Sequence, residues 1–197
     1  MSSPGPARTV LFSPKEHSHL TPWLAGLQAQ CITSDKLTSA FLPPLSHEKL
    51  LSWWKDRIAE AAAAQRVIVL LLLPPAVDSE TGNGVKIPGS HLVGVAMLAI
   101  PQLETAPFRA SVESLLLSTK YRRRGGARSL LIALEAQASI NGRYLLIAEV
   151  DSATPAMKLF LGLGYTTAGA IPGYCVNANG DFRSFGILYK NLKDSKC

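Results

Sequence analysis

The residues best suited to chemistry stand together at Arg122 to Ala127, where three arginines precede two glycines and an alanine. An apolar run, Val112 to Leu117, comes before them, and Leu130, Leu131 and Leu134 follow at helical spacing. The free N–H groups and the dipole of a helix start can receive phosphate oxygens, while glycine leaves room and arginine adds bidentate donors. This strand, basic glycine turn and helix predict a diphosphate site, although so short a pattern also fits a solvated turn.

Periodicity predicts the elements that must position this turn. We expect strands over 9–12, 66–73, 91–100, 109–117, 143–150, 165–171 and 183–189, and helices over 14–30, 46 to about 60, 125–140 and 154–164. Ser46 is the expected N-cap of the second helix, and its tryptophan pair is expected in the core or a pocket wall. The strand, helix and strand between 109 and 150 form a right-handed crossover with the two strands parallel.

Composition indicates an ordinary globular chain. With 197 residues, of which 47% are hydrophobic and 17% charged, we expect a single domain over residues 1–197. The net charge of +6 favours an anionic ligand or surface. Nucleic acid is therefore an alternative partner, but no nucleic-acid motif or separate basic tail accompanies the charge.

Cysteine and histidine are too scattered to suggest a metal site. Cys31, Cys175 and Cys197 form no Cys-x-x-Cys pair, so we expect reduced thiols, no disulfide framework and no metal. The first 14 residues fit neither a signal peptide nor a transit peptide, and the apolar run 67–73 is too short to cross a bilayer. We expect a cytoplasmic protein without a membrane partner.

Taken in order, these motifs resemble the GNAT superfamily of acetyl-coenzyme A dependent N-acetyltransferases over about residues 91–192. The family pattern (Gln or Arg)-x-x-Gly-x-(Gly or Ala) is matched by Arg122, Gly125 and Ala127. Its later Ala-x-x-Leu-Tyr-x-x-x-Gly-Phe is matched by residues Ala156, Leu159, Phe160, Gly164 and Tyr165. Within the superfamily, the spacing of Glu113 and Glu149 and the Ile-Pro-x-Tyr ending at Tyr174 look most like tabtoxin-resistance-type acetyltransferases, which modify the amine of a small toxin.

The resemblance implies a fold and a cofactor site. The fold is of the mixed α/β (α+β) class, a twisted sheet with a splayed parallel strand pair and helices on both faces. The co-substrate is acetyl-CoA. Its pantetheine arm would pair with the backbone of Leu115, Leu116 and Leu117, its pyrophosphate would bind Arg122, Arg123, Arg124, Gly125, Gly126 and Ala127, and Phe160 would line the same site.

Such a reaction needs a base, because an alkyl amine has a pKa of about 10 and must lose a proton before it attacks. Glu149 lies at the end of its strand beside the parallel-strand opening, and Glu113 lies in the adjacent strand. Both are candidate catalytic bases, and both could instead bind a cationic amine. The alternative for each is a structural carboxylate paired with an arginine such as Arg109 or Arg143.

Two departures from the family pattern bear on catalysis. Phe160 stands where the family often has the tyrosine that protonates the coenzyme A thiolate, and Ala153 stands where many relatives carry asparagine. A thiol pKa of about 8.5 makes the thiolate a tolerable leaving group, so loss of the acid need not abolish turnover. Tyr165 and Tyr174 are the substitutes at hand, although each also fits a packing or loop role.

The resulting hypothesis is acetyl transfer from acetyl-CoA to an amine of a small molecule, by direct attack, in a monomer or homodimer. A Cys175 nucleophile is disfavoured, because no histidine lies near it in the sequence. The alternatives are a catalytically silent coenzyme A binding module, a protein lysine acetyltransferase and a nucleic-acid binder. The identity of the amine is not predicted.

Overall fold

The computed structural model describes residues 6–36, 40–74 and 88–194. The segment 74–90 is rich in Pro, Gly, Asp and Asn, which predicts a surface loop, and most of it lies outside these residues. The strands are β1 (Arg8–Leu11), β2 (Arg66–Leu72), β3 (Leu92–Ala99), β4 (Arg109–Leu117), β5 (Leu145–Asp151), β6 (Thr166–Val176) and β7 (Phe182–Asn191). The α-helices are α1 (Pro14–His17), α2 (Thr21–Asp35), α3 (His47–Ala62), α4 (Gly126–Ile140) and α5 (Pro155–Leu161), with short 3₁₀ turns at 18–20, 89–91 and 119–121.

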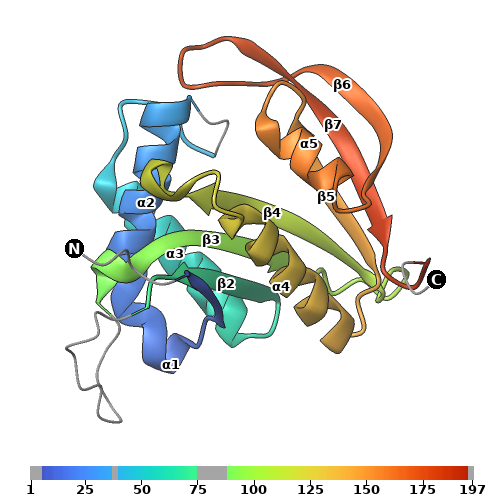
Figure 1. The fold of residues 1–197 in the computed structure, drawn as a ribbon, viewed down its shortest axis with the longest axis horizontal. Coiled ribbons are helices and arrows are strands. Elements are labelled where there is room, and N and C mark those ends of the chain that lie inside the picture. Colours follow the sequence, from blue (N-terminus) through green and yellow to red (C-terminus); the bar gives the residue numbers. More distant parts are fainter. Residues whose placement is uncertain (1–5, 37–39, 75–87, 195–197) are drawn as a thin grey trace.

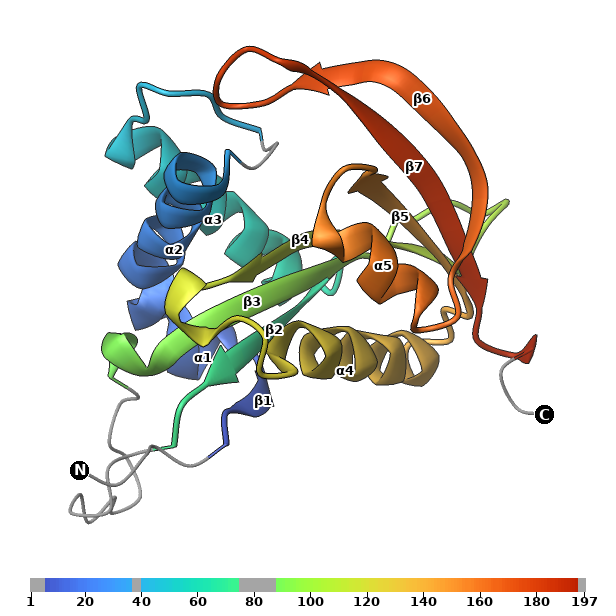
Figure 2. The same ribbon diagram turned by 45° about the horizontal axis from the view of Figure 1, so that its top comes forward.

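All seven strands join one twisted sheet in the order β1-β2-β3-β4-β5-β7-β6 (Figure 1). Neighbouring strands are antiparallel except β4 and β5, which are parallel and connected by α4. Helix α4 runs along one face of β2 to β4, and α2 and α3 lie on the opposite face (Figure 2). The expected fold class, a mostly antiparallel mixed sheet with one parallel pair and helices on both faces, is confirmed.

Two hydrophobic cores hold these layers together. One lies between the sheet and α4, which contributes Leu130, Leu131 and Leu134. The other lies beneath α2 and α3 and contains Trp54, which is fully buried. All seven residues of β2 are buried because the strand has a core on each face, as its continuous aliphatic run predicts.

A β-bulge interrupts β4 where it passes the site. Glu113 pairs with Met97 and Leu116 with Val95, so β4 holds one residue more than β3 between these pairs. Ser114 takes a positive φ of 49°, which is uncommon for a residue with a side chain. A bulge bends its strand, and here the alternation of side chains also shifts, so that Leu115 and Leu117 pack on the α4 side.

Several element boundaries differ from the sequence-based expectation. The first expected helix is divided into α1, a 3₁₀ turn and α2. Trp23, whose spacing from Leu20, Leu24 and Leu27 predicts a place on the apolar face of that helix, is 52% exposed. Helix α5 ends at Leu161 rather than at Gly164. Strand β6 continues to Val176, beyond the expected Ile171, and this extension brings a tyrosine to the site described below. The Ser46 cap is confirmed, since its side chain accepts a hydrogen bond from the backbone N–H of Lys49.

Two helical glycines should respond in opposite ways to alanine. A Cβ at Gly26 of α2 would meet no described heavy atom within 4 Å, whereas one at Gly126 of α4 would lie 2.6 Å from Cδ2 of buried Leu71. We expect Gly26→Ala to raise the free energy of unfolding by about 0.5–1 kcal/mol, through helix propensity. Gly126→Ala should lower it by about 1–3 kcal/mol, through overpacking. Urea denaturation followed by circular dichroism measures both, and equal effects would contradict the close packing of α4.

Candidate active site

The two expected catalytic glutamates lie where the parallel strands separate. The β4–β5 register runs from Arg109 opposite Leu145 to Val112 opposite Ala148, and the next pair would be Glu113 and Glu149. Pairing stops at that step, just before the β4 bulge. Since Leu146, Ala148 and Val150 face the α4 core, alternation directs Glu149 to the other face of the sheet. Two like charges directly opposite would also disfavour continued pairing.

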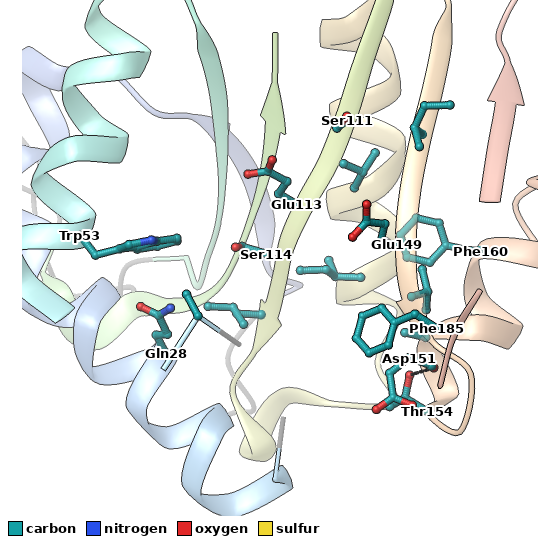
Figure 3. A pocket seen from close by; sticks show the side chains of 17 residues that line it. Gln28, Trp53, Ser111, Glu113, Ser114, Glu149, Asp151, Thr154, Phe160 and Phe185 are labelled. Carbon is teal, nitrogen blue, oxygen red and sulfur yellow. Dashed lines mark hydrogen bonds between the residues drawn. The ribbon is translucent and has the colours of Figure 1, made fainter. Parts of the chain in front are cut away.

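A cavity of about 550 Å³ occupies this opening. Figure 3 shows Glu149 between β4 and β5 with Phe160 beside it, and Glu113 projecting from β4 toward the side of Trp53. The other walls come from α2, α5 and β7. The lining residues are Gln28, Ala40, Trp53, Ser111, Val112, Glu113, Ser114, Leu115, Leu116, Ile147, Glu149, Val150, Asp151, Thr154, Ala156, Phe160 and Phe185.

Glu113 is held in an ion-paired chain. Its Oε2 accepts a hydrogen bond of 2.7 Å from the guanidinium of Arg66, whose side chain is only 6% exposed. Arg66 also bonds Glu60 at 2.6 Å, and Glu60 in turn pairs with Arg57 at 2.5 Å. The chain of two arginines and two glutamates carries no net charge. Arg109 and Arg143 were the expected partners of a structural carboxylate here. The partner of Glu113 is instead Arg66 of β2, a strand that β3 separates from β4.

Glu149 has a different environment. The residue is exposed, and its Oε2 accepts a hydrogen bond of 2.6 Å from the hydroxyl of Tyr174 on β6. Within the described part of the chain, the ion pairs involve Glu113 but not Glu149. The bond to the carboxylate raises the pKa of Tyr174 above its ordinary value. Of the two glutamates, Glu149 is therefore the one whose negative charge is not neutralised by an arginine.

Sequence reasoning did not identify Asp151, a third carboxylate of the cavity. Asp151 is buried and forms a two-point ion pair with Arg183 of β7, at 2.9 and 3.0 Å. Its Oδ1 also accepts the backbone N–H of Ala153, which shapes the turn into α5. The signal available was an aspartate at a strand end, two residues before Ala153 and four before the helix-starting Pro155.

The start of α4 has the geometry that an anion site requires. Gly125 is its N-cap with a φ of +81°, and a Cβ there would meet no described heavy atom within 4 Å. The left-handed backbone, rather than crowding, therefore calls for glycine. Arg123 and Arg124 beside it are exposed, Ala127 follows in the first turn, and Arg124 stacks on Tyr121 with 5.5 Å between its guanidinium carbon and the ring centroid. Free N–H groups and arginine charge face the same open space.

Arg122, the first residue of the sequence motif, has structural partners. Its guanidinium donates to both carboxylate oxygens of Asp35 at the end of α2, and to the carbonyl of Leu117 at 3.1 and 3.3 Å. The Asp35 bond raises the pKa of Arg122. The Arg122 side chain thus ties α2 to the end of β4, and leaves Arg123 and Arg124 as the exposed charges of the turn.

The backbone N–H and C=O groups of Leu115 to Leu117 point alternately toward β3 and away from it. The N–H of Ser118 bonds the carbonyl of Val93 in β3. Because backbone groups alternate along a strand, those of Leu116 also point to β3, while those of Leu115 and Leu117 point toward the opening. The Leu117 carbonyl already accepts hydrogen bonds from Arg122. Of the three leucines expected to pair with a pantetheine arm, Leu115 therefore offers the backbone groups best placed to do so.

The sequence that forms this site also matches a family model. The model of the "Acetyltransferase (GNAT) family" matches residues 48–165, which is more than half of the chain. The chain belongs to the GNAT acetyltransferase family. Membership supports acetyl transfer as the class of reaction, with acetyl-CoA as co-substrate.

Solved structures share the fold of this GNAT chain at low sequence identity. A protein from Acinetobacter baylyi ADP1 is 17% identical with a TM-score of 0.71, over 95% of this chain and 93% of that one. An N-acetyltransferase from Staphylococcus aureus Mu50 is 16% identical with a TM-score of 0.67, over 94% and 98%. A Salmonella typhimurium protein, solved with its cofactor acetyl-CoA, is 16% identical with a TM-score of 0.65, over 94% of each chain.

The position of Phe160 shows what this GNAT chain lacks beside the cavity. Phe160 is buried at the cavity wall and has no hydroxyl to donate. Tyr165 packs edge-on against it with centroids 4.9 Å apart, but Tyr165 does not line the cavity, and burial raises its pKa. Tyr174 does not line the cavity either, but its hydroxyl donates a hydrogen bond to Glu149, which does.

The described residues contain neither a cluster suited to a metal ion nor a membrane-spanning helix. No group of three or more His, Cys, Asp and Glu side chains there could hold a metal ion. In the same part of the chain, no helix combines the length and the apolar character that crossing a bilayer requires.

The two glutamates should differ in their contribution to stability. Glu113→Gln removes one of two carboxylates from a buried arginine, and we expect it to lower the free energy of unfolding by about 1–2 kcal/mol. Glu149→Gln, at an exposed position, should change it by less than about 0.5 kcal/mol. Chemical denaturation of both variants gives the comparison. Equal losses would contradict the assignment of Glu113 as the structurally committed carboxylate.

Proposed function

We propose that this protein, as a single domain over residues 1–197, transfers the acetyl group of acetyl-CoA to an amine of a small molecule, with Glu149 as the base. One observation carries the proposal: Glu149, which has no arginine partner among the described residues, lines a cavity at the separation of β4 and β5. Within the GNAT family, the Ile-Pro-x-Tyr segment and the glutamate spacing favour a tabtoxin-resistance-type enzyme.

The residues for holding the co-substrate surround that opening. Gly125 leaves space before the N-terminus of α4, and Arg123 and Arg124 add positive charge to it. The unpaired edge of β4 offers the backbone of Leu115 for strand-like hydrogen bonds. Acetyl-CoA bound there would supply an activated acetyl thioester. Phe160 would provide an apolar wall beside it.

Glu149 meets the chemical requirement for a base. A protonated amine entering the cavity is attracted by the carboxylate, which can then accept its proton directly or through one water molecule. Glu113 is less suited to this task, since protonating it would leave Arg66 buried with one carboxylate fewer. We therefore propose Glu149 as the base and Glu113 as a wall and support of the cavity.

The dimensions and lining of the cavity favour a small acceptor. About 550 Å³ falls within the range of 300–1,000 Å³ typical of small-molecule pockets. Trp53 and Phe185 add aromatic walls, which suit an amine with an apolar body. A protein lysine remains the alternative acceptor within the same chemistry. A coenzyme A binding module without turnover is the second candidate, which the missing hydroxyl at Phe160 favours.

Acetyl-CoA binding should depend on the arginines of the glycine turn. We expect isothermal titration of the wild type to give micromolar affinity, and Arg123→Glu/Arg124→Glu to weaken it at least about 30-fold by replacing attraction with repulsion. Lys55→Glu, which reverses an exposed charge on α3, is the matched control and should bind normally. A folded wild type that does not bind acetyl-CoA would refute the proposed cofactor site.

Turnover should depend on Glu149. We expect Glu149→Gln to lower kcat by about 10²–10³-fold, the usual scale of a lost general base, with little change in acetyl-CoA affinity. Thiol release from acetyl-CoA, screened over a panel of primary amines, measures kcat. An undiminished kcat would remove Glu149 as the base. Tight acetyl-CoA binding without thiol release on any amine would instead favour the silent module.

A further inference from the structure

Strand β6, which lies at the edge of the sheet and is separated from β5 by β7, contains a bulge. Ile171 pairs with Phe185 and Cys175 with Arg183, so three residues of β6 oppose one residue of β7. The three are Pro172, Gly173 and Tyr174, and Gly173 takes a φ of +62°. Bulges near functional sites often redirect a side chain.

The redirected side chain is that of Tyr174. Its ring lies 5.1 Å from that of Phe185, measured between centroids, and its hydroxyl donates to Oε2 of Glu149 at 2.6 Å. Since β7 lies between β6 and β5, the tyrosine crosses a whole strand to reach this carboxylate. A contact over such a distance depends on the bulge and on the Phe185 ring beneath it.

We propose that Tyr174 is a positioning residue, which holds Oε2 of Glu149 so that Oε1 faces the acceptor amine. The inference rests on the proposed function, in which Glu149 is the base. A carboxylate on an exposed strand position can rotate freely, and a fixed donor on one oxygen selects one orientation of the other. Productive geometry would then be present before the amine arrives.

The other charged groups around Glu149 are already paired. On β4, Glu113 is bonded to Arg66, and on β5 itself Asp151 is bonded to Arg183 of β7. Helix α5 contributes the uncharged Ala156 and Phe160 to the cavity. Beside Tyr174 on β6, burial raises the pKa of the Cys175 thiol above its ordinary value. Tyr174 therefore supplies a neutral hydrogen-bond donor to Glu149, while Glu113 and Asp151 nearby are each paired with an arginine.

The expected effect of losing this bond is a loss of orientation. Tyr174→Phe removes the hydroxyl that holds Oε2 of Glu149 and keeps the ring that packs on Phe185. The freed carboxylate should lower kcat by about 5- to 20-fold, with the KM for acetyl-CoA unchanged.

The first experiment measures kcat and KM with the primary amine that the wild type turns over fastest in the panel. Tyr189→Phe is the matched control, since it removes an exposed hydroxyl from β7 of the same hairpin and should leave both constants unchanged. In a Glu149→Gln background, Tyr174→Phe should have no further effect on kcat. A Tyr174→Phe variant with the kcat of the wild type, or with the same loss of kcat in the Glu149→Gln background, would overturn the proposal.

A second measurement needs no turnover and separates failure of this inference from failure of the proposed function. Titration of ¹³C-labelled tyrosine by NMR, assigned with Tyr174→Phe, should give Tyr174 a higher pKa in the wild type than in Glu149→Gln. Equal values would show that the bond does not form in solution. A wild type that shows the difference but acetylates no amine would refute the function while leaving the contact intact.

Discussion

The structure depends on a single constraint: β4 and β5 must be parallel neighbours at one end and separate at the other. Their register ends at Val112 and Ala148. The bulge at Ser114 then turns Leu117 into the core beneath α4. There Leu117 lies beside the start of the helix, where Gly126 permits close contact with Leu71. The opening between the strands and the position of the start of α4 are thus two results of one backbone distortion.

The same constraint separates the roles of two chemically identical side chains. Glu113 lies on the strand that continues beside β3, where buried Arg66 requires compensating charge. Glu149 lies on β5 beyond the point of separation, where α2 and α3 no longer cover the sheet, and so it stays exposed with a neutral partner. The buried arginine beside Glu113, not residue type or motif position, decides which carboxylate remains free to exchange a proton.

Features with local causes could be predicted from the sequence. The bounds of β4 at Arg109 and Leu117, the α4 start after Gly125 and the Ser46 cap all follow from periodicity or capping within a few residues. Features that depend on long-range packing could not. The Arg122–Asp35 pair joins positions 87 apart in the chain, and the Arg66–Glu113 pair requires knowing that β2 approaches β4. The extension of β6 was missed because Pro172 and Gly173 indicate a turn, whereas the structure absorbs them in a bulge.

The β6–β7 hairpin connects this chemistry to the least buried part of the sheet. The first nine residues of β6 are all exposed, so few side-chain contacts resist its displacement. Besides the backbone ladder between β5 and β7, two side-chain links reach from the hairpin to β5: the Arg183–Asp151 ion pair and the Tyr174–Glu149 hydrogen bond. The first joins a buried carboxylate near the turn into α5, and the second joins the exposed carboxylate of the cavity. Displacement of β6 alone would therefore free Glu149 from Tyr174 before it altered the core, because β7 stays attached to β5 through the backbone ladder.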